Sequence, residues 1–197
     1  MQNPTAPAIF LASSSRYRRS LLDRFLDDYE AVSPDVDENN VDDLGPDELA
    51  AQLARKKAEA VAASSPRALV IGADQLAVLD DQVLGKPGDH QKAVEQLVAA
   101  SGKAVRFVTA VCILDPESRK RYEHIDTTIV RFRQFDRRLA EAYLRLDEPY
   151  DCAGSFKVEG AGFVLFQSVK AEDPTALIGL PMIWVAGRLL ELGYLLP

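Results

Sequence analysis

Histidine and cysteine are scarce in this chain of 197 residues, which contains two of each. Cys112 and Cys152 lie far apart and no CxxC pair occurs, so the sequence indicates neither a disulfide framework nor a zinc site. This pattern favours a reducing compartment, and we expect a cytoplasmic protein. With only His90 and His124 available, a mechanism that needs a cluster of histidines is disfavoured.

An excess of positive charge is also missing. The chain contains 30 Asp and Glu residues against 23 Lys and Arg residues, and its formal net charge is −7. Proteins that bind DNA or RNA without sequence preference normally carry a basic face and a high pI, so the charge argues against a stable nucleic-acid partner. Local basic clusters on an acidic chain fit a small anionic ligand better.

Long hydrophobic runs are absent as well. No apolar stretch approaches the length of a membrane span, and residues 1–8 contain no apolar core of a secretory signal, so we expect no membrane partner. Internal repeats, low-complexity tracts and long linkers are missing too. A chain of this length predicts one domain over residues 1–197, with a core divided into two lobes around a cleft.

Strands and helices alternate along the chain. We expect strands at residues 9–12, 68–72, 105–114 and 122–135, a hairpin over 78–84 and a β-rich segment over 153–166. We expect helices at residues 18–25, 47–63, 90–100 and 136–146, and a last helix that ends at Gly193. Asp47 and Asp136 are the expected caps of two of these helices. The mixture predicts an α/β fold with a mixed, strongly curved sheet flanked by helices.

The most informative segment is the turn after the first expected strand, where three serines precede a pair of arginines. Ser13, Ser14 or Ser15 can cap the helix that follows, and Arg18 and Arg19 lie in its first turn. Arginines there oppose the helix dipole, which prefers negative charge at this end. A bound anion would remove the conflict, because arginine forks bind phosphate oxygens. An ordinary capped surface helix with solvated arginines explains the local pattern equally well.

A second segment places Asp74 just after the expected strand at 68–72, and Lys86 directly after Gly85. The end of a buried strand is where α/β sheets place ligands, and a carboxylate there can bind a hard cation or deprotonate water. Asp74 on its own is better explained as the cap of a turn. Lys86 favours a ligand-binding role for this segment over a turn cap, because glycine permits close backbone approach and lysine supplies a point charge for phosphate. No Walker motif is present.

Two further groups are ambiguous by themselves. The closely spaced carboxylates Asp35, Asp37 and Glu38 suit a magnesium ion that keeps several waters, although acidic loops are usually just solvated. Lys57 lies on an expected helix, where a lysine more often faces solvent than a ligand. Together the cationic patches and the carboxylates, without a histidine or cysteine nucleophile, indicate metal-assisted attack of water on a phosphoanhydride.

The ordered set of motifs resembles a known family. It consists of the segments Leu11–Ser15, Arg18–Arg19, Val36–Glu38, Lys57–Ala58, Gly72–Gln75, Gly85–Pro87, Ser101–Gly102 and Gly179–Pro181. In order and spacing these segments resemble the Maf-like nucleotide pyrophosphatases, over nearly the whole chain. The resemblance implies a Maf/ITPase-like fold, in which a curved mixed sheet is flanked by helices and two lobes enclose a substrate cleft.

Within this family, the chain is similar to the branch that cleaves 7-methyl-GTP. Gln75 follows Asp74 where the dTTP/UTP-cleaving branch has threonine, and residues 152–160 and 173–177 also differ from that branch. The resemblance implies a house-cleaning hydrolase that cuts the α–β phosphoanhydride of this modified nucleoside triphosphate and releases pyrophosphate. One alternative is a dTTP or UTP pyrophosphatase, which Gln75 and Glu159 argue against. Another is a nucleotide-binding regulatory factor in septum formation.

The resemblance also implies roles for individual residues. Asp74 is expected to accept the proton of the attacking water and to share a divalent cation with Glu38, magnesium or, as a second choice, manganese. The residues expected to contact the triphosphate are Ser13, Arg18, Lys57 and Lys86. The residues expected to set the base preference are Tyr17, Gln75 and Glu159. A homodimer is implied as well.

An aromatic face and a carboxylate are physically suited to that preference. A purine methylated at N7 is cationic, so it is favoured by the ring of Tyr17 and by the charge of Glu159. A cation–π contact contributes about 0.5–2 kcal/mol, or about one decade of preference, so Gln75 and pocket shape have to add to it. Taken without the resemblance, Tyr17 is explained as a half-buried packing residue and Glu159 as a solvated strand residue.

Overall fold

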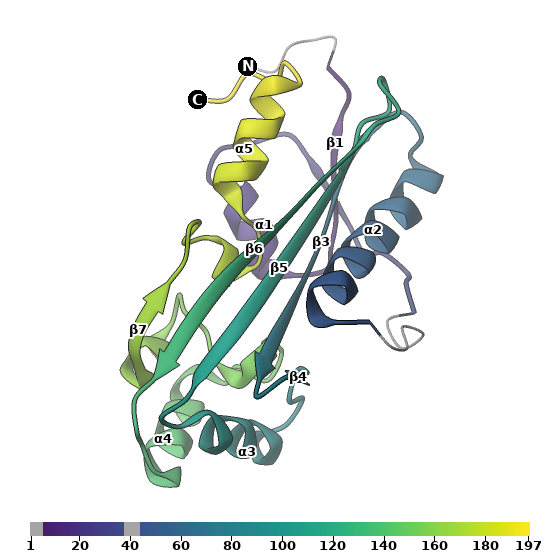
Figure 1. The fold of residues 1–197 in the computed structure, drawn as a ribbon. Coiled ribbons are helices and arrows are strands. Elements are labelled where there is room, and N and C mark those ends of the chain that lie inside the picture. The colour runs from purple at the N-terminus through teal and green to yellow at the C-terminus, as the bar shows by residue number, and fades with distance from the viewer. Residues whose placement is uncertain (1–5, 38–43) are drawn as a thin grey trace.

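A mixed seven-stranded sheet forms the centre of the molecule in the computed structural model, which describes residues 6–37 and 44–197 (Figure 1). The strands are β1 (Ile9–Ala12), β2 (Glu30–Val32), β3 (Leu69–Leu79), β4 (Gln82–Leu84), β5 (Ala104–Leu114), β6 (Arg121–Phe132) and β7 (Phe166–Lys170). Their order is β2-β1-β3-β5-β6-β7, with β4 paired to β3. Strands β2, β1 and β3 are parallel, whereas β3, β5, β6 and β7 are antiparallel, so the expected mixed α/β sheet is confirmed.

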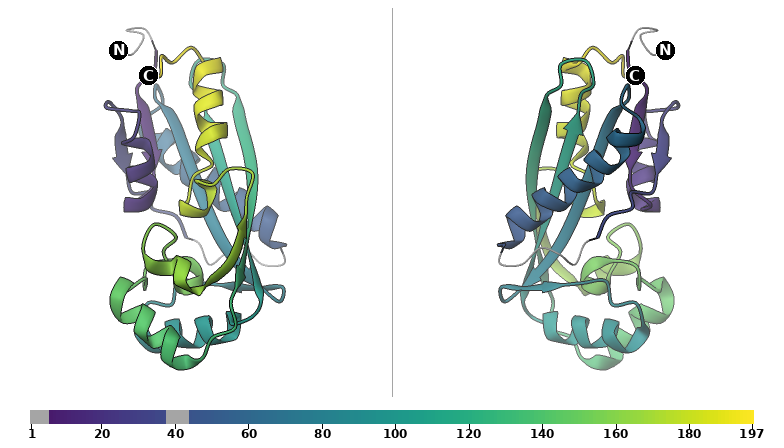
Figure 2. Two further views of the ribbon diagram at one scale, coloured as in Figure 1. Left: turned by 90° about the vertical axis from the view of Figure 1, so that its left-hand side faces the viewer. Right: turned by 90° about the vertical axis from the view of Figure 1, so that its right-hand side faces the viewer.

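Helices cover both faces of this sheet. The α-helices are α1 (Arg16–Leu22), α2 (Pro46–Ser64), α3 (His90–Ala100), α4 (Arg137–Asp147) and α5 (Met182–Glu191). Three short 3₁₀ helices are also present in the described residues, η1 (Ala153–Ser155), η2 (Ala161–Leu165) and η3 (Ala176–Ile178). Figure 2 shows α2 on one face of the sheet and α5 on the other, with α3 and α4 together at one end. None of the helices in residues 6–37 and 44–197 combines the length and apolar character needed to cross a membrane.

The core lies in three clusters that follow the period-two alternation of the strands. Odd-numbered residues of β3, such as Ile71, face α1 and α5, whereas even-numbered ones, such as Val70, face α2. A third cluster joins α3 and α4 to the far ends of β3, β5 and β6, and includes the edge-to-face ring pair of Phe107 and Phe156. We call the end with α1, α2 and α5 the first lobe and the end with α3 and α4 the second lobe.

Several boundaries predicted from the sequence are confirmed. The helix at His90–Ala100 has the predicted bounds, and the Asp136 side chain caps α4 by accepting a hydrogen bond from the Leu139 N–H at 3.0 Å. Ser15 is the serine that caps α1. The predicted Asp47 cap is wrong, because α2 begins at Pro46 after Gly45. Proline at the first helical position lacks an N–H that would need a partner there, which explains the earlier start.

Strand β3 departs from the prediction in a way that bears on function. The predicted strand ends at residue 72, but β3 continues to Leu79 and turns into β4 through Asp80 and Asp81, both with positive φ. Pairing with β5 over this whole length, including Asp74 opposite Ala110, stabilises the extension. Asp74 therefore lies within a strand rather than after one. Strand β1 does stop at Ala12, opposite Gly72, so Asp74 lies just beyond the end of its parallel neighbour.

The predicted β-rich segment at 153–166 is also wrong, because it forms the 3₁₀ turns η1 and η2. Gly154 and Ser155 have φ of 74° and 62°, which no strand accommodates. A side chain at Gly154 would start 3.0 Å from the ring of Phe107. Close packing of this segment on the sheet thus replaces strand pairing.

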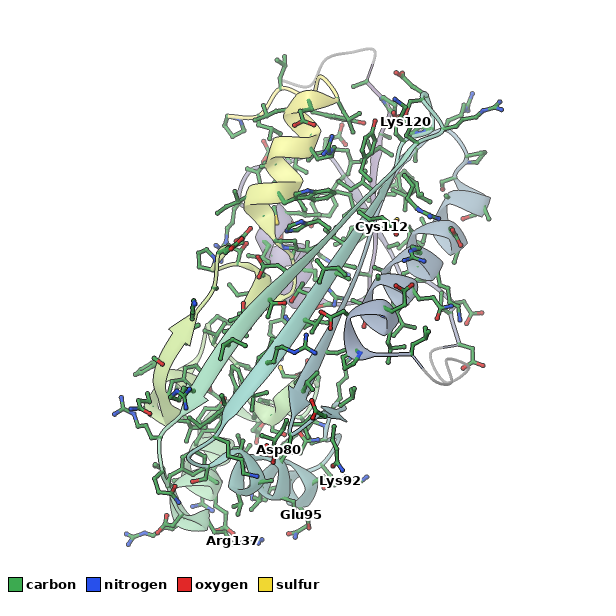
Figure 3. The ribbon with its side chains drawn as sticks, in the orientation of Figure 1. Asp80, Lys92, Glu95, Cys112, Lys120 and Arg137 are labelled. Carbon is green, nitrogen blue, oxygen red and sulfur yellow. The ribbon has the colours of Figure 1, made fainter. Side chains whose placement is uncertain are left out.

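Figure 3 shows labelled charged side chains at the surface of the molecule and one labelled cysteine inside it. Lys92 and Glu95 on α3 and Arg137 at the start of α4 point away from the second lobe, whereas Cys112 lies within β5. Both cysteines are free, as the sequence predicts, and Cys112 is buried. Burial raises the pKa of the Cys112 thiol to about 12.

Candidate functional site

A cavity of about 560 Å³ opens between the two lobes. This volume lies in the range of sites that hold small-molecule ligands, about 300–1,000 Å³. Its walls come from the serine-rich turn and α1, from α2, from β3 and β5, from Lys86, and from the segments at 151–159 and 177–179. The residues predicted from the sequence that line it are Ser13, Tyr17, Arg18, Lys57, Gln75, Lys86 and Glu159.

The serine-rich turn begins where β1 ends. Ser13 is buried, and its Oγ accepts hydrogen bonds from the Ser15 N–H at 3.1 Å and from Arg18 Nη1 at 3.3 Å. The Arg18 Nε also donates to the carbonyl oxygen of Gly179 at 3.0 Å. Gly179 has φ of 134°, and a side chain there would start 3.2 Å from Cγ of Arg18. The turn, Arg18 and the 177–179 segment thus hold one another at the cavity wall.

The strongest electrostatic feature is a buried ion pair between α2 and β3. Lys57 Nζ donates to Oδ1 of Asp74 at 2.6 Å, and the two residues are 8% and 6% exposed. Gly72 makes this approach of helix to strand feasible, because a Cβ there would lie 2.4 Å from the carbonyl oxygen of Ala54. A buried ion pair is a poor source of stability, since desolvation opposes the attraction. Lys57 lines the cavity, whereas Asp74 lies behind it and is not among the lining residues, and a buried pair next to a cavity suits a chemical role better.

Gln75 is the next residue along β3, and its amide is held from three sides. Nε2 donates toward Oγ1 of Thr109 at 2.9 Å and toward the carbonyl oxygens of Ala176 and Leu177 at 2.8 Å and 3.2 Å. These contacts join β3, β5 and η3. The side chain of Gln75 lines the cavity, so its orientation is set by the protein before any ligand arrives.

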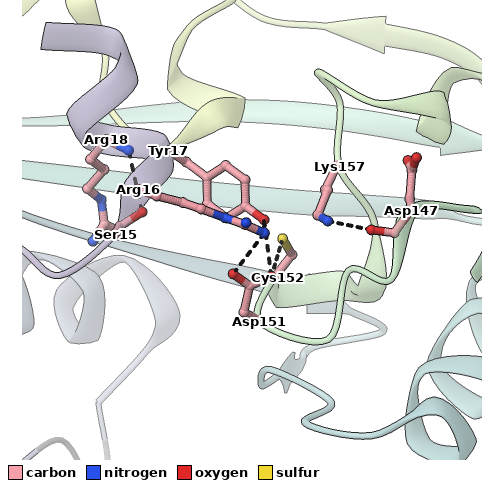
Figure 4. Close-up of polar contacts among 8 residues, drawn as sticks. All are labelled: Ser15, Arg16, Tyr17, Arg18, Asp147, Asp151, Cys152 and Lys157. Atoms are coloured by element: carbon pink, nitrogen blue, oxygen red, sulfur yellow. Dashed lines mark hydrogen bonds and ion pairs between the residues drawn. The ribbon is translucent and has the colours of Figure 1, made fainter. Parts of the chain in front are cut away.

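A polar network joins the lobes at the mouth of the cavity (Figure 4). The hydroxyl of Tyr17 donates to Oδ1 of Asp151 at 3.1 Å and accepts from Arg16 Nη2 at 2.7 Å, and Arg16 also pairs with Asp151 at 3.5 Å. Burial alone would raise the pKa of Asp151, but hydrogen bonds from Tyr17 and Cys152 and the charge of Arg16 together lower it. Burial first, and then the contact with Cys152, raises the pKa of Tyr17. The Asp151 side chain is therefore a carboxylate and the Tyr17 side chain a neutral phenol.

The segment that carries Glu159 is anchored to the end of α4. Lys157 Nζ donates to the carbonyl oxygen of Asp147, as drawn in Figure 4, and the Lys157 N–H donates to the Tyr143 hydroxyl at 2.9 Å. Oδ2 of Asp147 accepts from the Ala161 N–H at 2.7 Å. Glu159 thus lies on a loop whose two sides are both held by hydrogen bonds.

Of the two predicted metal ligands, Asp74 lies within the described residues. Residues 6–37 and 44–197 contain no cluster of three or more His, Cys, Asp or Glu side chains suited to a metal ion. Glu38, the other predicted metal ligand, lies outside the described residues. Magnesium binds proteins through one or two carboxylates together with substrate phosphates and water, so Asp74 fits as one such ligand.

Sequence reasoning missed several residues of the cavity wall. Among them are Asp151, Phe107 and Leu177. Asp151 directly precedes the Cys152–Gly160 segment, which the sequence analysis connects with substrate preference, so its position next to that segment could have identified it as a site residue. Phe107 and Leu177 lie in apolar surroundings that look like ordinary core, and no pattern in the sequence distinguishes them.

The fold and the cavity define an α/β protein in which arginine and lysine side chains, carboxylates and an aromatic ring line one space between two lobes. Such a mixture suits a ligand that joins a polyanionic part to a ring. The family model described as Maf-like protein matches residues 8–192, and the chain belongs to this family.

Curated relatives match the chain over nearly its full length. A 7-methyl-GTP pyrophosphatase of Cupriavidus metallidurans is 47% identical over 194 residues, which cover 98% of this chain and 98% of that protein. Proteins with the same name from Xanthomonas axonopodis pv. citri and Pseudomonas aeruginosa are 48% and 45% identical over 191 residues, 97% of this chain and 100% of each relative.

Proposed function

We propose that this protein is a nucleoside triphosphate pyrophosphatase that hydrolyses the α–β phosphoanhydride of 7-methyl-GTP to 7-methyl-GMP and pyrophosphate. The observation that carries the proposal is the buried Lys57–Asp74 pair, whose lysine lines the same cavity as Arg18 and Lys86. The names of the full-length relatives give the same reaction and substrate for those proteins. Family membership supports the transfer of the activity to this chain.

Asp74 is the proposed proton acceptor. Lys57 donates to Oδ1, and among the described residues none forms a hydrogen bond with Oδ2, so Oδ2 is the oxygen that takes a proton from water. Lys57 holds the carboxylate in place, since its ammonium nitrogen lies 2.6 Å from Oδ1. Asp74 and Glu38 would hold a divalent cation, magnesium in this proposal, and the cation would supply Lewis-acid polarisation of a phosphate oxygen.

Phosphate binding is proposed for Ser13, Arg18, Lys57 and Lys86. The planar guanidinium of Arg18 is already oriented by the Gly179 carbonyl, so it loses less side-chain freedom when it binds phosphate oxygens. Lysine ammonium groups neutralise the negative charge that develops on the leaving pyrophosphate. These residues come from three separate parts of the chain.

Base recognition is proposed for Tyr17, Gln75 and Glu159, with the Asp151 carboxylate beside them. A base methylated at N7 carries a positive charge, which the ring of Tyr17 and the two carboxylates favour over a neutral purine or pyrimidine. Both carboxylates line the same cavity as the Tyr17 ring.

Pyrophosphate release with magnesium and four substrates, 7-methyl-GTP, GTP, dTTP and UTP, tests the proposal. We expect kcat/KM for 7-methyl-GTP to exceed the others by about tenfold or more, from cation recognition alone. Equal values across the four substrates would overturn the base assignment. Binding of nucleotide without release of pyrophosphate would overturn the enzymatic activity and favour a regulatory role.

A further inference from the structure

Thr109 lies directly behind Gln75 and is almost completely buried, with 1% of its surface exposed. The two residues are opposite each other on β3 and β5, so their side chains share one face of the sheet. The Thr109 hydroxyl is a donor as well as an acceptor: it gives its hydrogen to the Ala176 carbonyl oxygen at 2.9 Å. Toward Gln75 it therefore acts as an acceptor.

The hydrogen-bond count fixes the direction of the Gln75 amide. Nε2 carries two hydrogens, and the Thr109 hydroxyl and the carbonyl oxygens of Ala176 and Leu177 offer acceptors for them. An amide turned by 180° would set its oxygen against two carbonyl oxygens that cannot donate. The nitrogen therefore faces the protein, and among the described residues Oε1 receives no hydrogen bond.

From this geometry we propose that Thr109 is a positioning residue, which holds the Gln75 amide so that Oε1 is the atom presented to the base. The inference rests on the proposed function. Guanine carries donors at N1 and at its 2-amino group, and an acceptor oxygen matches them, whereas adenine has an acceptor at N1. Methylation at N7 withdraws electrons from the ring and makes the N1–H a better donor. By holding the Gln75 amide, Thr109 thus adds recognition of the hydrogen-bonding edge of guanine to recognition of the positive charge of the methylated base.

Thr109→Val separates this role from simple packing. Valine has nearly the same shape as threonine but offers no oxygen, so the Gln75 amide keeps only the carbonyl oxygens of Ala176 and Leu177 as acceptors. The amide is then held less firmly, and Oε1 is presented to the base less precisely. Thr109→Ser keeps the hydroxyl and should keep the orientation.

The experiment compares kcat/KM for 7-methyl-GTP with kcat/KM for 7-methyl-ATP, two substrates that share the methyl cation and differ in the edge. We expect Thr109→Val to lower the ratio by about threefold to tenfold, the size of one net hydrogen bond, mainly through the KM for 7-methyl-GTP. Thr109→Ser should return the ratio to within about twofold of the wild type. In a Gln75→Leu background, Thr109→Val should leave the ratio unchanged, because the group it orients is gone.

The possible outcomes distinguish a failure of the proposed function from a failure of the inference about Thr109. A wild type that does not prefer 7-methyl-GTP to GTP overturns the proposed function and the inference with it. A wild type with that preference, and a Thr109→Val variant with an unaltered ratio, overturns the inference alone. So does an equal loss in the Gln75→Leu background. If Thr109→Val does not fold, Thr109→Ala is measured in its place, with the same ratio deciding.

Discussion

Asp74 combines burial, charge and position in a way that a structural role does not require. Asp74→Asn keeps the shape and an oxygen for Lys57 but removes the basic oxygen. We expect turnover of 7-methyl-GTP to fall by about 10²–10⁴-fold, the usual contribution of a general base. Binding of the nucleotide should stay largely intact, because Arg18 and the lysines proposed to contact the phosphates are unchanged. Turnover by pyrophosphate release and affinity by calorimetry measure the two effects.

Asp80→Asn is the matched control for this prediction. Asp80 pairs with Lys103 at the same 2.6 Å, but on the surface, where the two side chains are 65% and 48% exposed. An exposed pair contributes little, and this one lies away from the residues that line the cavity. Turnover of Asp80→Asn should match that of the wild type. Near-normal turnover in Asp74→Asn with saturating magnesium would contradict the assignment of Asp74.

Single residues were predictable from the sequence where their effect is local. The Asp136 cap depends on the next three residues and was predicted from the sequence, and Ser15 was one of three serines predicted as the cap of α1. The contact between Lys57 and Asp74 was not derivable in this way, because it depends on how α2 packs on β3. Lys57 looked like a solvated helix residue for the same reason.

Helix α2 and strand β3 approach each other at Gly72, and this contact places Lys57 beside Asp74. In Gly72→Ala the new Cβ would lie 2.4 Å from the Ala54 carbonyl oxygen and 2.6 Å from the Ala58 nitrogen, so the α2 backbone has to move. We expect the free energy of unfolding to fall by about 1–3 kcal/mol. Turnover should fall as well, because α2 carries Lys57. Denaturant titration and pyrophosphate release measure these changes.

Gly187→Ala provides the control for a glycine in open space. Gly187 lies within α5, and a Cβ there would meet nothing within 4 Å. Alanine is the better helix former, so the variant should be more stable by about 1 kcal/mol with unchanged turnover. Unaltered stability and turnover in Gly72→Ala would show that the close packing of α2 on β3 does not position the pair.

Elements were predictable where one pattern dominates and not where tertiary contacts decide. Helix α3 has clear apolar spacing and was placed with its true bounds. Strand β3 was predicted too short because Asp74 and Gln75 interrupt its apolar pattern, yet pairing with β5 continues to Val78 and pairing with β4 to Leu79. The 153–166 segment looked like strands because of its apolar and glycine content, but the positive φ of Ser155 excludes that geometry.

The two lobes meet at Tyr17, which α1 supplies from the first lobe, and Asp151, which follows α4 in the second (Figure 4). Composition predicted two lobes around a cleft, but it held no information on which residues touch across the opening. The pairing is a consequence of the long strands β3, β5 and β6, which run through both lobes and fix their distance. Site residues far apart in the sequence therefore come together without any local signal.

Tyr17 offers two separable properties at this junction, a ring and a hydroxyl. Tyr17→Ala removes both, and we expect the preference for 7-methyl-GTP over GTP to fall by about tenfold with loss of the cation–π contact. Tyr17→Phe keeps the ring and loses the exposed hydrogen bonds of the hydroxyl to Asp151 and Arg16, so the preference should change by less than about threefold. The ratio of kcat/KM values for the two nucleotides is the measurement.

Tyr29 is the matched control for Tyr17, because its hydroxyl also bonds a carboxylate but does so within one lobe. Tyr29 donates to Oδ1 of Asp23 at 2.6 Å, and both residues belong to the first lobe and lie outside the cavity wall. Tyr29→Phe and Tyr29→Ala should both leave the nucleotide ratio unchanged, whatever they do to stability. If Tyr17→Ala retains the wild-type ratio, the ring does not recognise the methylated base, and the preference has to come from Gln75 and the carboxylates.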